Sequence, residues 1–207
     1  MENFKTVKDY GEDEFIEKKS RFIGQCRPVK NQDDALSFIS EMKEVHPHGT
    51  NAYAYILRED NTMRYSDAGE PSGTAGVPIL EVIKKEGLTD VCVVVTRYYG
   101  GIQLGAGGLV RAYGKGAKFA VNAAKPAMKI YCSQFLIRCD YTTYGKLEYV
   151  INAEGYLLKD CAFENDVCLT VAVESGREEA FLKTVSYTSG GSAQANELPG
   201  EYIAKEL

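Results

Sequence analysis

The chain has 207 residues, of which 44% are hydrophobic and 26% are charged, and its formal net charge is −5 at pH 7. These proportions are ordinary for a soluble globular protein of one large domain or two small ones. No apolar run approaches the roughly 18 residues of a membrane span, and the N-terminus has no apolar signal core. We therefore expect a cytoplasmic protein with no membrane partner.

Cysteine and histidine usage limits the redox and metal chemistry. The six cysteines include no C-x-x-C pair, and several lie in apolar strand-like runs, so we expect buried free thiols rather than a disulfide framework. The two histidines, His46 and His48, flank a proline; they give no zinc spacing and are too few to indicate a nucleophilic triad. The sequence predicts no metal and no cofactor.

The charges are unevenly distributed along the chain. Residues 1–90 carry 12 basic and 17 acidic residues, and residues 140–207 carry five basic and 12 acidic residues. Between them, residues 91–139 carry seven basic residues and no acidic residue. A local basic patch within an acidic protein indicates an anionic partner more clearly than the global charge does.

The first third of the chain predicts a strand, a helix and a strand pair. A strand is expected over residues 14–26, where Phe22, Gly24 and Cys26 alternate with Ile23 and Gln25. Asn31 is the expected N-cap of a helix that ends before His46. Two further strands are expected over residues 52–57 and 62–65, joined by a tight turn.

A first segment rich in glycine and serine, residues 66–76, leads into a second helix. Thr74 is the expected N-cap, which places Pro78 in the first turn, where its missing N–H costs nothing, and Gly87 ends the helix. The apolar β-branched run at residues 91–96 (VCVVVT) follows. This run predicts a central strand that is buried on both faces.

A second glycine-rich segment, residues 97–108, leads into a helix that is expected to begin at Leu109. Gly114 and Gly116 inside this helix each cost roughly 1 kcal/mol relative to Ala, which indicates close backbone packing there. Polar and mostly basic residues follow one side of the helix at 100° per residue: Arg111, Lys115, Lys118, Asn122 and Lys125.

The last third of the chain has the element order β-α-β-β-α-β. Strands are expected over residues 130–141, 156–163 and 167–174, with a weaker final strand, and the helices lie between them. This order in about 75 residues is the ferredoxin-like, split β-α-β arrangement. We expect an α+β protein with one domain at residues 1–127 and a second at residues 128–207.

The second glycine-rich segment is the better candidate for binding an anion. It is neither a Walker loop, because no Gly-Lys-Ser/Thr follows, nor a dinucleotide fingerprint, because Val110 replaces the third glycine. Its structural alternative is a tight turn in which glycine adopts a left-handed backbone. The predicted residues for binding phosphate or nucleic acid are Arg97, Tyr98, Tyr99, Gly100, Gly101, Gly105, Gly107, Gly108, Arg111, Lys115 and Lys118.

Two carboxylates distinguish the first glycine-rich segment. Asp67 and Glu70 are candidates for an acid/base pair, although Asp and Ser beside Gly and Pro usually serve as turn and cap residues. Both readings stay open from the sequence, and no catalytic residue is assigned.

RYSDAGEPSGTAGVPIL and VVVTRYYGGIQLGAGGLVRAY together resemble the IMPACT family, including its bacterial branch, and KKSRFIG at residues 18–24 matches the family's opening strand. One stretch departs from the family, because Thr50-Asn51-Ala52 stands where members often have His-Asn-Cys. The resemblance implies a first domain with the fold of the second domain of small-subunit ribosomal protein five. It also implies a ferredoxin-like C-terminal domain similar to the last domain of elongation factor G.

The resemblance also implies a connection with translation, because eukaryotic relatives are translational regulators. The leading hypothesis is a non-enzymatic module that binds RNA or a ribosome-associated protein through the basic, glycine-rich surface. One alternative is an enzyme acting on a phosphorylated small molecule, with Asp67 or Glu70 as acid/base. Another is a protein-interaction module that uses the acidic C-terminal domain.

Overall fold

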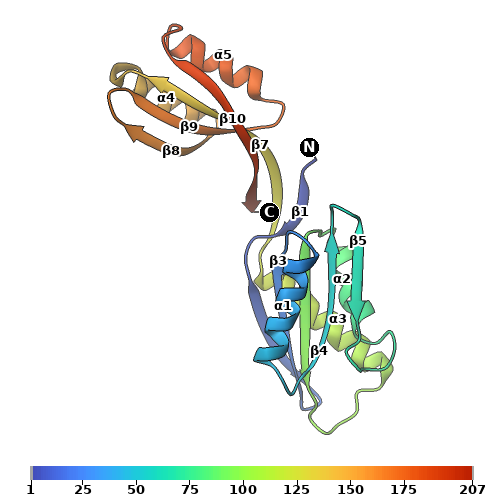
Figure 1. The fold of residues 1–207 in the computed structure, drawn as a ribbon. Helices are drawn as coiled ribbons and strands as arrows, with labels where there is room; N and C mark the ends of the chain where they lie inside the picture. The colour runs from blue at the N-terminus through green and yellow to red at the C-terminus, as the bar shows by residue number, and fades with distance from the viewer. Residues whose placement is uncertain (1, 207) are drawn as a thin grey trace. The chain divides into compact units, whose positions relative to one another are not determined.

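The computed structural model describes residues 2–206 and divides into two compact units (Figure 1). The first unit comprises residues 4–128 with 204–206, and the second comprises residues 129–203 with 2–3. The chain passes from the first unit to the second within one long strand, β7 (Pro126–Cys139).

A five-stranded antiparallel sheet forms the centre of the first unit, in the order β2-β3-β6-β4-β5. Its strands are β2 (Gly11–Glu17), β3 (Ser20–Pro28), β4 (Thr50–Leu57), β5 (Thr62–Ser66) and β6 (Val91–Tyr98). Strand β6 is buried from Val91 to Arg97 and pairs with both β3 and β4. The prediction of a central strand covered on both faces is confirmed.

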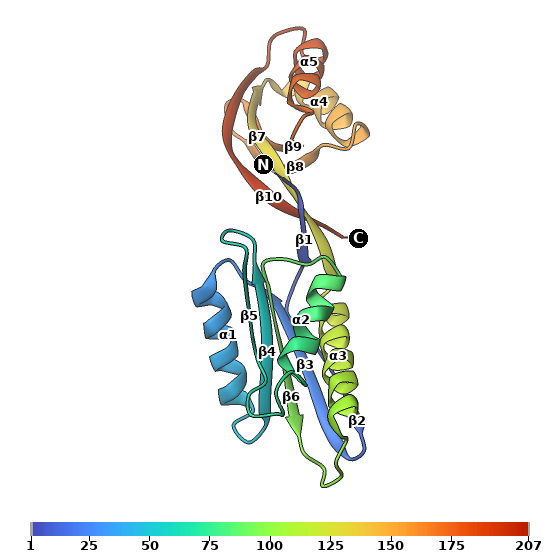
Figure 2. The same cartoon turned by 90° about the vertical axis from the view of Figure 1, so that its right-hand side faces the viewer.

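Three helices cover the two faces of this sheet (Figure 2). Helix α1 (Gln32–Val45) lies on one face, and α2 (Gly76–Lys85) and α3 (Ala106–Ala123) lie on the other. The side chain of Asn31 accepts a hydrogen bond from the backbone N–H of Asp34 at 2.9 Å, which confirms the predicted cap of α1.

Each face of the sheet has its own apolar core, because successive residues of a strand point to opposite faces. Cys92 and Val94 of β6 join the core under α1. Val93 and Val95 join the larger core under α2 and α3. The fold therefore presents Arg97, the next residue in this alternation, on the face that α2 and α3 cover.

The strand predicted over residues 14–26 is a hairpin in the structure, so that prediction was wrong in its middle. Glu17 ends β2 and pairs with Ser20, the first residue of β3, so Lys18 and Lys19 form a two-residue turn. Their φ angles are 44° and 62°, in the left-handed region that glycine or asparagine usually supplies. Two lysines gave no turn signal, which is why the hairpin was missed.

Both glycine-rich segments differ from the prediction at the point where the helix begins. Helix α2 has Ala75 as its N-cap, whereas the hydroxyl of the predicted cap, Thr74, donates to the carbonyl of Pro71 at 2.6 Å. Helix α3 begins at Ala106, one turn before the predicted Leu109, with Gly105 as N-cap at φ 75°. Glycines do not exclude a helix when tertiary packing stabilises its first turn.

The two glycines inside α3 have different environments. A Cβ on Gly116 would lie 2.8 Å from Cγ1 of Val95, and a Cβ on Gly24 of β3 would lie 2.2 Å from the carbonyl oxygen of Gly116. A Cβ on Gly114 would meet nothing within 4 Å. The predicted close packing is therefore correct for Gly116 and wrong for Gly114.

The second unit is built on a sheet in the order β10-β7-β9-β8, and β1 (Phe4–Val7) also pairs with β7. Its remaining elements are α4 (Tyr141–Ala153), β8 (Leu157–Phe163), β9 (Val167–Glu174), α5 (Glu178–Thr188) and β10 (Gln194–Glu206). The β-α-β-β-α-β order confirms the predicted ferredoxin-like arrangement. Its core joins residues of the sheet to residues of both helices, including Leu147 and Phe181.

All six cysteines are free thiols, as predicted, and four of them are buried. Burial raises the pKa of Cys26 and of Cys92, so these thiols stay protonated at neutral pH. Within residues 2–206, no helix is long and apolar enough to cross a membrane.

Candidate functional site

The two glycine-rich segments meet at a buried ion pair. Nη1 of Arg97 donates to Oε1 of Glu70 at 2.9 Å and to Oε2 at 3.2 Å, and each side chain is only 9% exposed. The hydroxyl of Tyr113, on α3, donates to the same Oε1 at 2.8 Å. The segments that the sequence presented as separate candidates therefore belong to one site.

Arg97 also connects this ion pair to the β2–β3 hairpin. Its Nη2 donates to Oγ of Ser20 at 3.4 Å, and the backbone N–H of Gly100 donates to the same Oγ at 3.2 Å. The guanidinium lies 5.1 Å from the ring centroid of Tyr99. The charge of Arg97 is neutralised by Glu70, so this arginine orders the loop rather than presenting a free cation.

Asp67 caps helix α2 from the preceding loop. Its carboxylate accepts backbone hydrogen bonds from Gly73 at 2.8 Å, Ala75 at 3.0 Å and Gly76 at 2.8 Å. Burial acts to raise the pKa of Asp67, but the three hydrogen bonds together lower it below its usual value. This geometry corresponds to the capping alternative, in which the carboxylate accepts hydrogen bonds from the backbone at the start of the helix.

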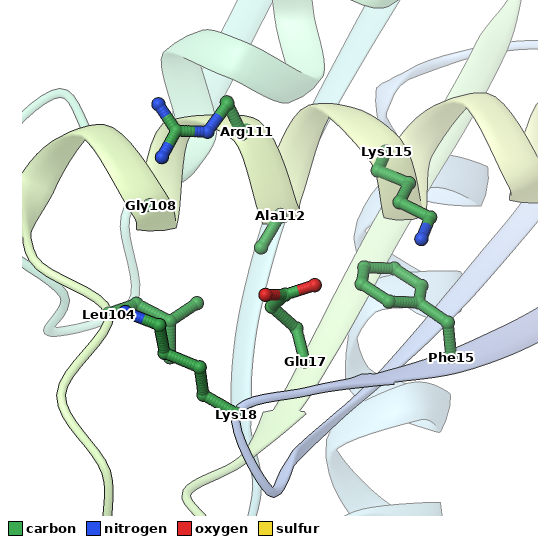
Figure 3. A pocket seen from close by; sticks show the side chains of 8 residues that line it. All are labelled: Phe15, Glu17, Lys18, Leu104, Gly108, Arg111, Ala112 and Lys115. Carbon is green, nitrogen blue, oxygen red and sulfur yellow. The ribbon is translucent and has the colours of Figure 1, made fainter.

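A small cavity between the hairpin and α3 is lined by three cations and by Glu17, whose carboxylate points into the middle of it (Figure 3). Its volume is about 220 Å³, and its charged lining comprises Lys18, Arg111, Lys115 and Glu17, so its formal charge is +2. The rest of the lining is Phe15, Leu104, Gly108 and Ala112. We call it the basic cavity, and its net positive charge suits an anion.

Aromatic rings contact one cation of the basic cavity, and the turn that carries another packs against the glycine-rich loop. Nζ of Lys115 lies 4.2 Å from the ring centroid of Phe15 and 5.4 Å from that of Phe119, at cation–π distance. Lys18 occupies the left-handed turn of the hairpin. A Cβ on Gly100 would lie 1.9 Å from the carbonyl oxygen of Lys19, so the glycine-rich loop packs directly against this turn.

A second cavity adjoins the first turn of α3. Its volume is about 460 Å³, and Tyr99, which is 59% exposed, forms part of its wall. The other lining residues are Glu70, Pro71, Arg97, Gln103, Leu104, Gly105, Ala106 and Leu109. We call it the Tyr99 cavity. Leu104 lines both this cavity and the basic cavity, which are therefore neighbours.

Five predicted binding residues lie outside these cavities: Tyr98, Gly100, Gly101, Gly107 and Lys118. Tyr98 points to the α1 face of the sheet, where its hydroxyl lies 2.9 Å from Nδ1 of His46. Lys118 forms an ion pair with Glu86 of α2 at 2.6 Å, and this contact comes first among the causes that lower the pKa of Glu86. The exposed glycines of the loop and of the first turn of α3 line neither cavity: Gly101 and Gly107.

Comparison with known proteins assigns the chain to a family. Residues 18–121 match the Impact N-terminal domain, and residues 137–192 match a domain of unknown function, DUF1949. The chain is 39% identical to "IMPACT family member YvyE" of Bacillus subtilis over 209 residues, which cover 100% of this chain and 96% of that relative. The chain belongs to the IMPACT family.

The match to other IMPACT proteins extends over both units. "IMPACT family member YigZ" of Escherichia coli is 32% identical over 181 residues, covering 86% of this chain and 89% of YigZ. A solved structure described as "Crystal structure of an hypothetical protein" has a TM-score of 0.61 and 28% identity, and the match covers 96% of this chain and 98% of that one. The predicted bacterial-type family and the predicted fold class are both confirmed.

Sequence reasoning missed part of the site of this IMPACT chain. Lys18 lies inside the strand predicted over residues 14–26, and its place in a turn facing α3 (Figure 3) was not foreseen. Phe15, Glu17 and Leu104 had no signal of their own. The Lys18-Lys19 pair gave no clue either, because glycine or asparagine usually supplies the left-handed backbone of such a turn.

Within residues 2–206, no group of three or more His, Cys, Asp and Glu side chains lies together as a metal site requires.

Proposed function

We propose that this chain is a translation-associated regulator that binds RNA through the basic cavity and the adjoining first turns of α3. The observation that carries the proposal is that Lys18, Arg111 and Lys115 line one cavity from two separate elements and outnumber its one carboxylate, Glu17. Phosphates supply most of the affinity of RNA for protein, and lysine and arginine are their usual contacts.

The glycine-rich loop supports the same proposal. Helix α3 has 18 residues and its N-cap, Gly105, has no side chain. Within residues 2–206 no side chain is hydrogen-bonded to the first backbone N–H groups of α3, so these groups remain available to an anion. In contrast, the N-terminus of α2 is occupied by Asp67. The N–H groups at the start of α2 are therefore already hydrogen-bonded, whereas those at the start of α3 suit a phosphate.

The alternative of an enzyme with Asp67 or Glu70 as acid/base receives less support. Asp67 accepts three backbone hydrogen bonds, and Glu70 accepts hydrogen bonds from Arg97 and Tyr113. A general base needs a lone pair within reach of the substrate proton and a pKa near the working pH. The lowered pKa of Asp67 and its three backbone partners do not suit that task.

The test is the salt dependence of RNA affinity for the full chain. Replacing Arg111 and Lys115 by Gln removes two charges, and each lost phosphate contact lowers the slope of log K against log salt concentration by about 0.7–0.9. We expect weaker binding of a labelled RNA and a slope smaller by about 1.5 in fluorescence anisotropy titrations.

Lys43 provides the matched control, because it is an exposed lysine on α1, on the opposite face of the same sheet. Lys43→Gln is expected to leave the slope nearly unchanged. If the Arg111→Gln, Lys115→Gln double variant binds RNA with wild-type affinity and slope, the proposal is wrong.

A further inference from the structure

The Tyr99 cavity has the features of a site for a flat heterocycle. Its volume of about 460 Å³ lies within the range of about 300–1,000 Å³ that holds small organic ligands. Tyr99 offers an exposed ring, and Arg97 lies beside that ring at 5.1 Å. Pro71, Leu104 and Leu109 add apolar walls. A planar base that stacks on Tyr99 would form a group of three planar moieties with the Tyr99 ring and the Arg97 guanidinium.

The polar lining of the Tyr99 cavity offers a hydrogen-bond acceptor. Oε1 of Glu70 accepts from both Arg97 and Tyr113, whereas Oε2 accepts only the longer bond from Arg97 at 3.2 Å. A carboxylate oxygen has two lone pairs, so Glu70 retains acceptor capacity at Oε2. The matching chemical group is an amino group on the edge of a base, as in the contact of Glu with cytosine N4.

The two cavities lie side by side along the start of α3. The Tyr99 cavity is lined by Gly105 and Ala106, and the basic cavity by Gly108 and Arg111, about one helical turn further on. Leu104 contributes to both. A nucleotide has the corresponding division into a neutral planar base and an anionic phosphate.

Resting on the proposed RNA binding, we infer that the site takes an unpaired nucleotide of single-stranded RNA, with the base in the Tyr99 cavity and a phosphate in the basic cavity. A base within a duplex has its hydrogen-bonding edge occupied and both faces stacked, so it does not enter such a cavity. The site therefore distinguishes single strands from duplexes, and cytosine from uracil, which has a carbonyl where cytosine has its amino group.

The structure fixes this arrangement before a ligand binds. The loop that carries Tyr99 is anchored by the hydrogen bond from Gly100 to Ser20, and Glu70 is held by Arg97 and Tyr113. A preformed stacking surface and acceptor lower the entropic cost of ordering the site on binding.

The first test compares the full chain with two variants at Tyr99. Tyr99→Leu removes the aromatic face, and Tyr99→Phe keeps it. We expect Tyr99→Leu to weaken binding of a labelled oligo(C) about tenfold and Tyr99→Phe to retain it, because stacking of one base on an aromatic side chain has that magnitude. The salt slope is expected to stay unchanged in both, because no charge is lost.

A further variant keeps Tyr99 and instead obstructs the Tyr99 cavity with a larger side chain on α3. Ala106 is exposed and lies in the first turn of α3, so Ala106→Phe obstructs the cavity without altering a charge or the ion pair. It is expected to weaken oligo(C) binding as Tyr99→Leu does, and to weaken the binding of a duplex RNA less. Wild-type protein is expected to bind oligo(C) at least about fivefold more tightly than oligo(U).

The outcomes separate this inference from the proposed function. Equal affinity of the wild-type chain for oligo(C), oligo(U) and duplex RNA, or wild-type affinity in Tyr99→Leu, overturns the unpaired-base site and leaves phosphate binding intact. An absence of binding to every RNA overturns the proposed function, and the inference with it.

Discussion

The carboxylate of Asp67 stabilises the loop before α2, because it accepts three backbone N–H groups at the start of that helix. Asp67→Ala leaves these donors without their partner. We expect it to lower the free energy of unfolding by about 1–2 kcal/mol at pH 7, the usual effect of losing an N-cap side chain. Urea denaturation followed by circular dichroism measures this difference.

The contribution of Asp67 to the free energy of unfolding depends on pH in a direction that its pKa shift fixes. Although burial acts to raise the pKa of Asp67, the hydrogen bonds lower it overall, so the folded-state pKa lies below the unfolded value of about 3.9. Its stabilising effect is complete above that unfolded value and is lost as the pH falls through the folded-state pKa. The stability gap between wild type and Asp67→Ala should therefore narrow below about pH 4. A gap that stays constant down to pH 2 would contradict this account.

Lys18 combines an unfavourable backbone conformation with a place in the basic cavity. Its φ of 44° is one that glycine adopts without strain. Lys18→Gly is expected to raise the free energy of unfolding by about 0.5–1 kcal/mol and to weaken RNA binding. Denaturant titration and anisotropy measure the two effects on the same sample.

Lys19→Gly is the control for Lys18. Lys19 has the same kind of backbone, at φ 62°, but does not line the basic cavity. It should give a similar gain in stability with a smaller loss of affinity. If both variants leave RNA binding unchanged, Lys18 serves the hairpin alone.

At the scale of elements, α3 contains its own matched pair of substitutions. Gly114→Ala adds a methyl group that meets nothing within 4 Å, so it should raise the free energy of unfolding by up to about 1 kcal/mol through helix propensity. Gly116→Ala places a methyl group 2.8 Å from buried Val95, and overpacking of this kind costs about 1–3 kcal/mol. In thermal unfolding we expect a higher melting temperature for Gly114→Ala and a lower one for Gly116→Ala. A higher melting temperature for both variants would show that α3 shifts freely on the sheet.

Elements with a repeating pattern were predictable from the sequence, and their junctions were not. The apolar run of β6 and the Asn31 cap of α1 carry local signals that the structure confirms. The start of α3 and the turn at Lys18-Lys19 depend on contacts between distant segments. The packing of Gly100 on Lys19 is one such contact, and no periodicity reveals it.

At the scale of the whole molecule, the fold class and the order of the elements were predictable from sequence patterns and from the family resemblance. The number of unpaired cations was not, because folding brings some of them to carboxylates. Residues 91–139 contain no acidic residue, yet two of their cations are neutralised by carboxylates from another segment. Glu70 pairs with Arg97, and Glu86 pairs with Lys118. Counting charge along the chain located the helix that contributes Arg111 and Lys115 to the basic cavity, but it overstated the number of free cations.

The buried pair of Glu70 and Arg97 also limits how this sequence can change over generations. Removing either partner leaves an uncompensated charge in a nearly dry environment, at a cost of about 3–5 kcal/mol, whereas replacing both by apolar residues of similar volume is often neutral. Substitutions at positions 70 and 97 are therefore expected to occur together. A lineage that loses one of these residues passes through an unstable intermediate unless the other changes with it.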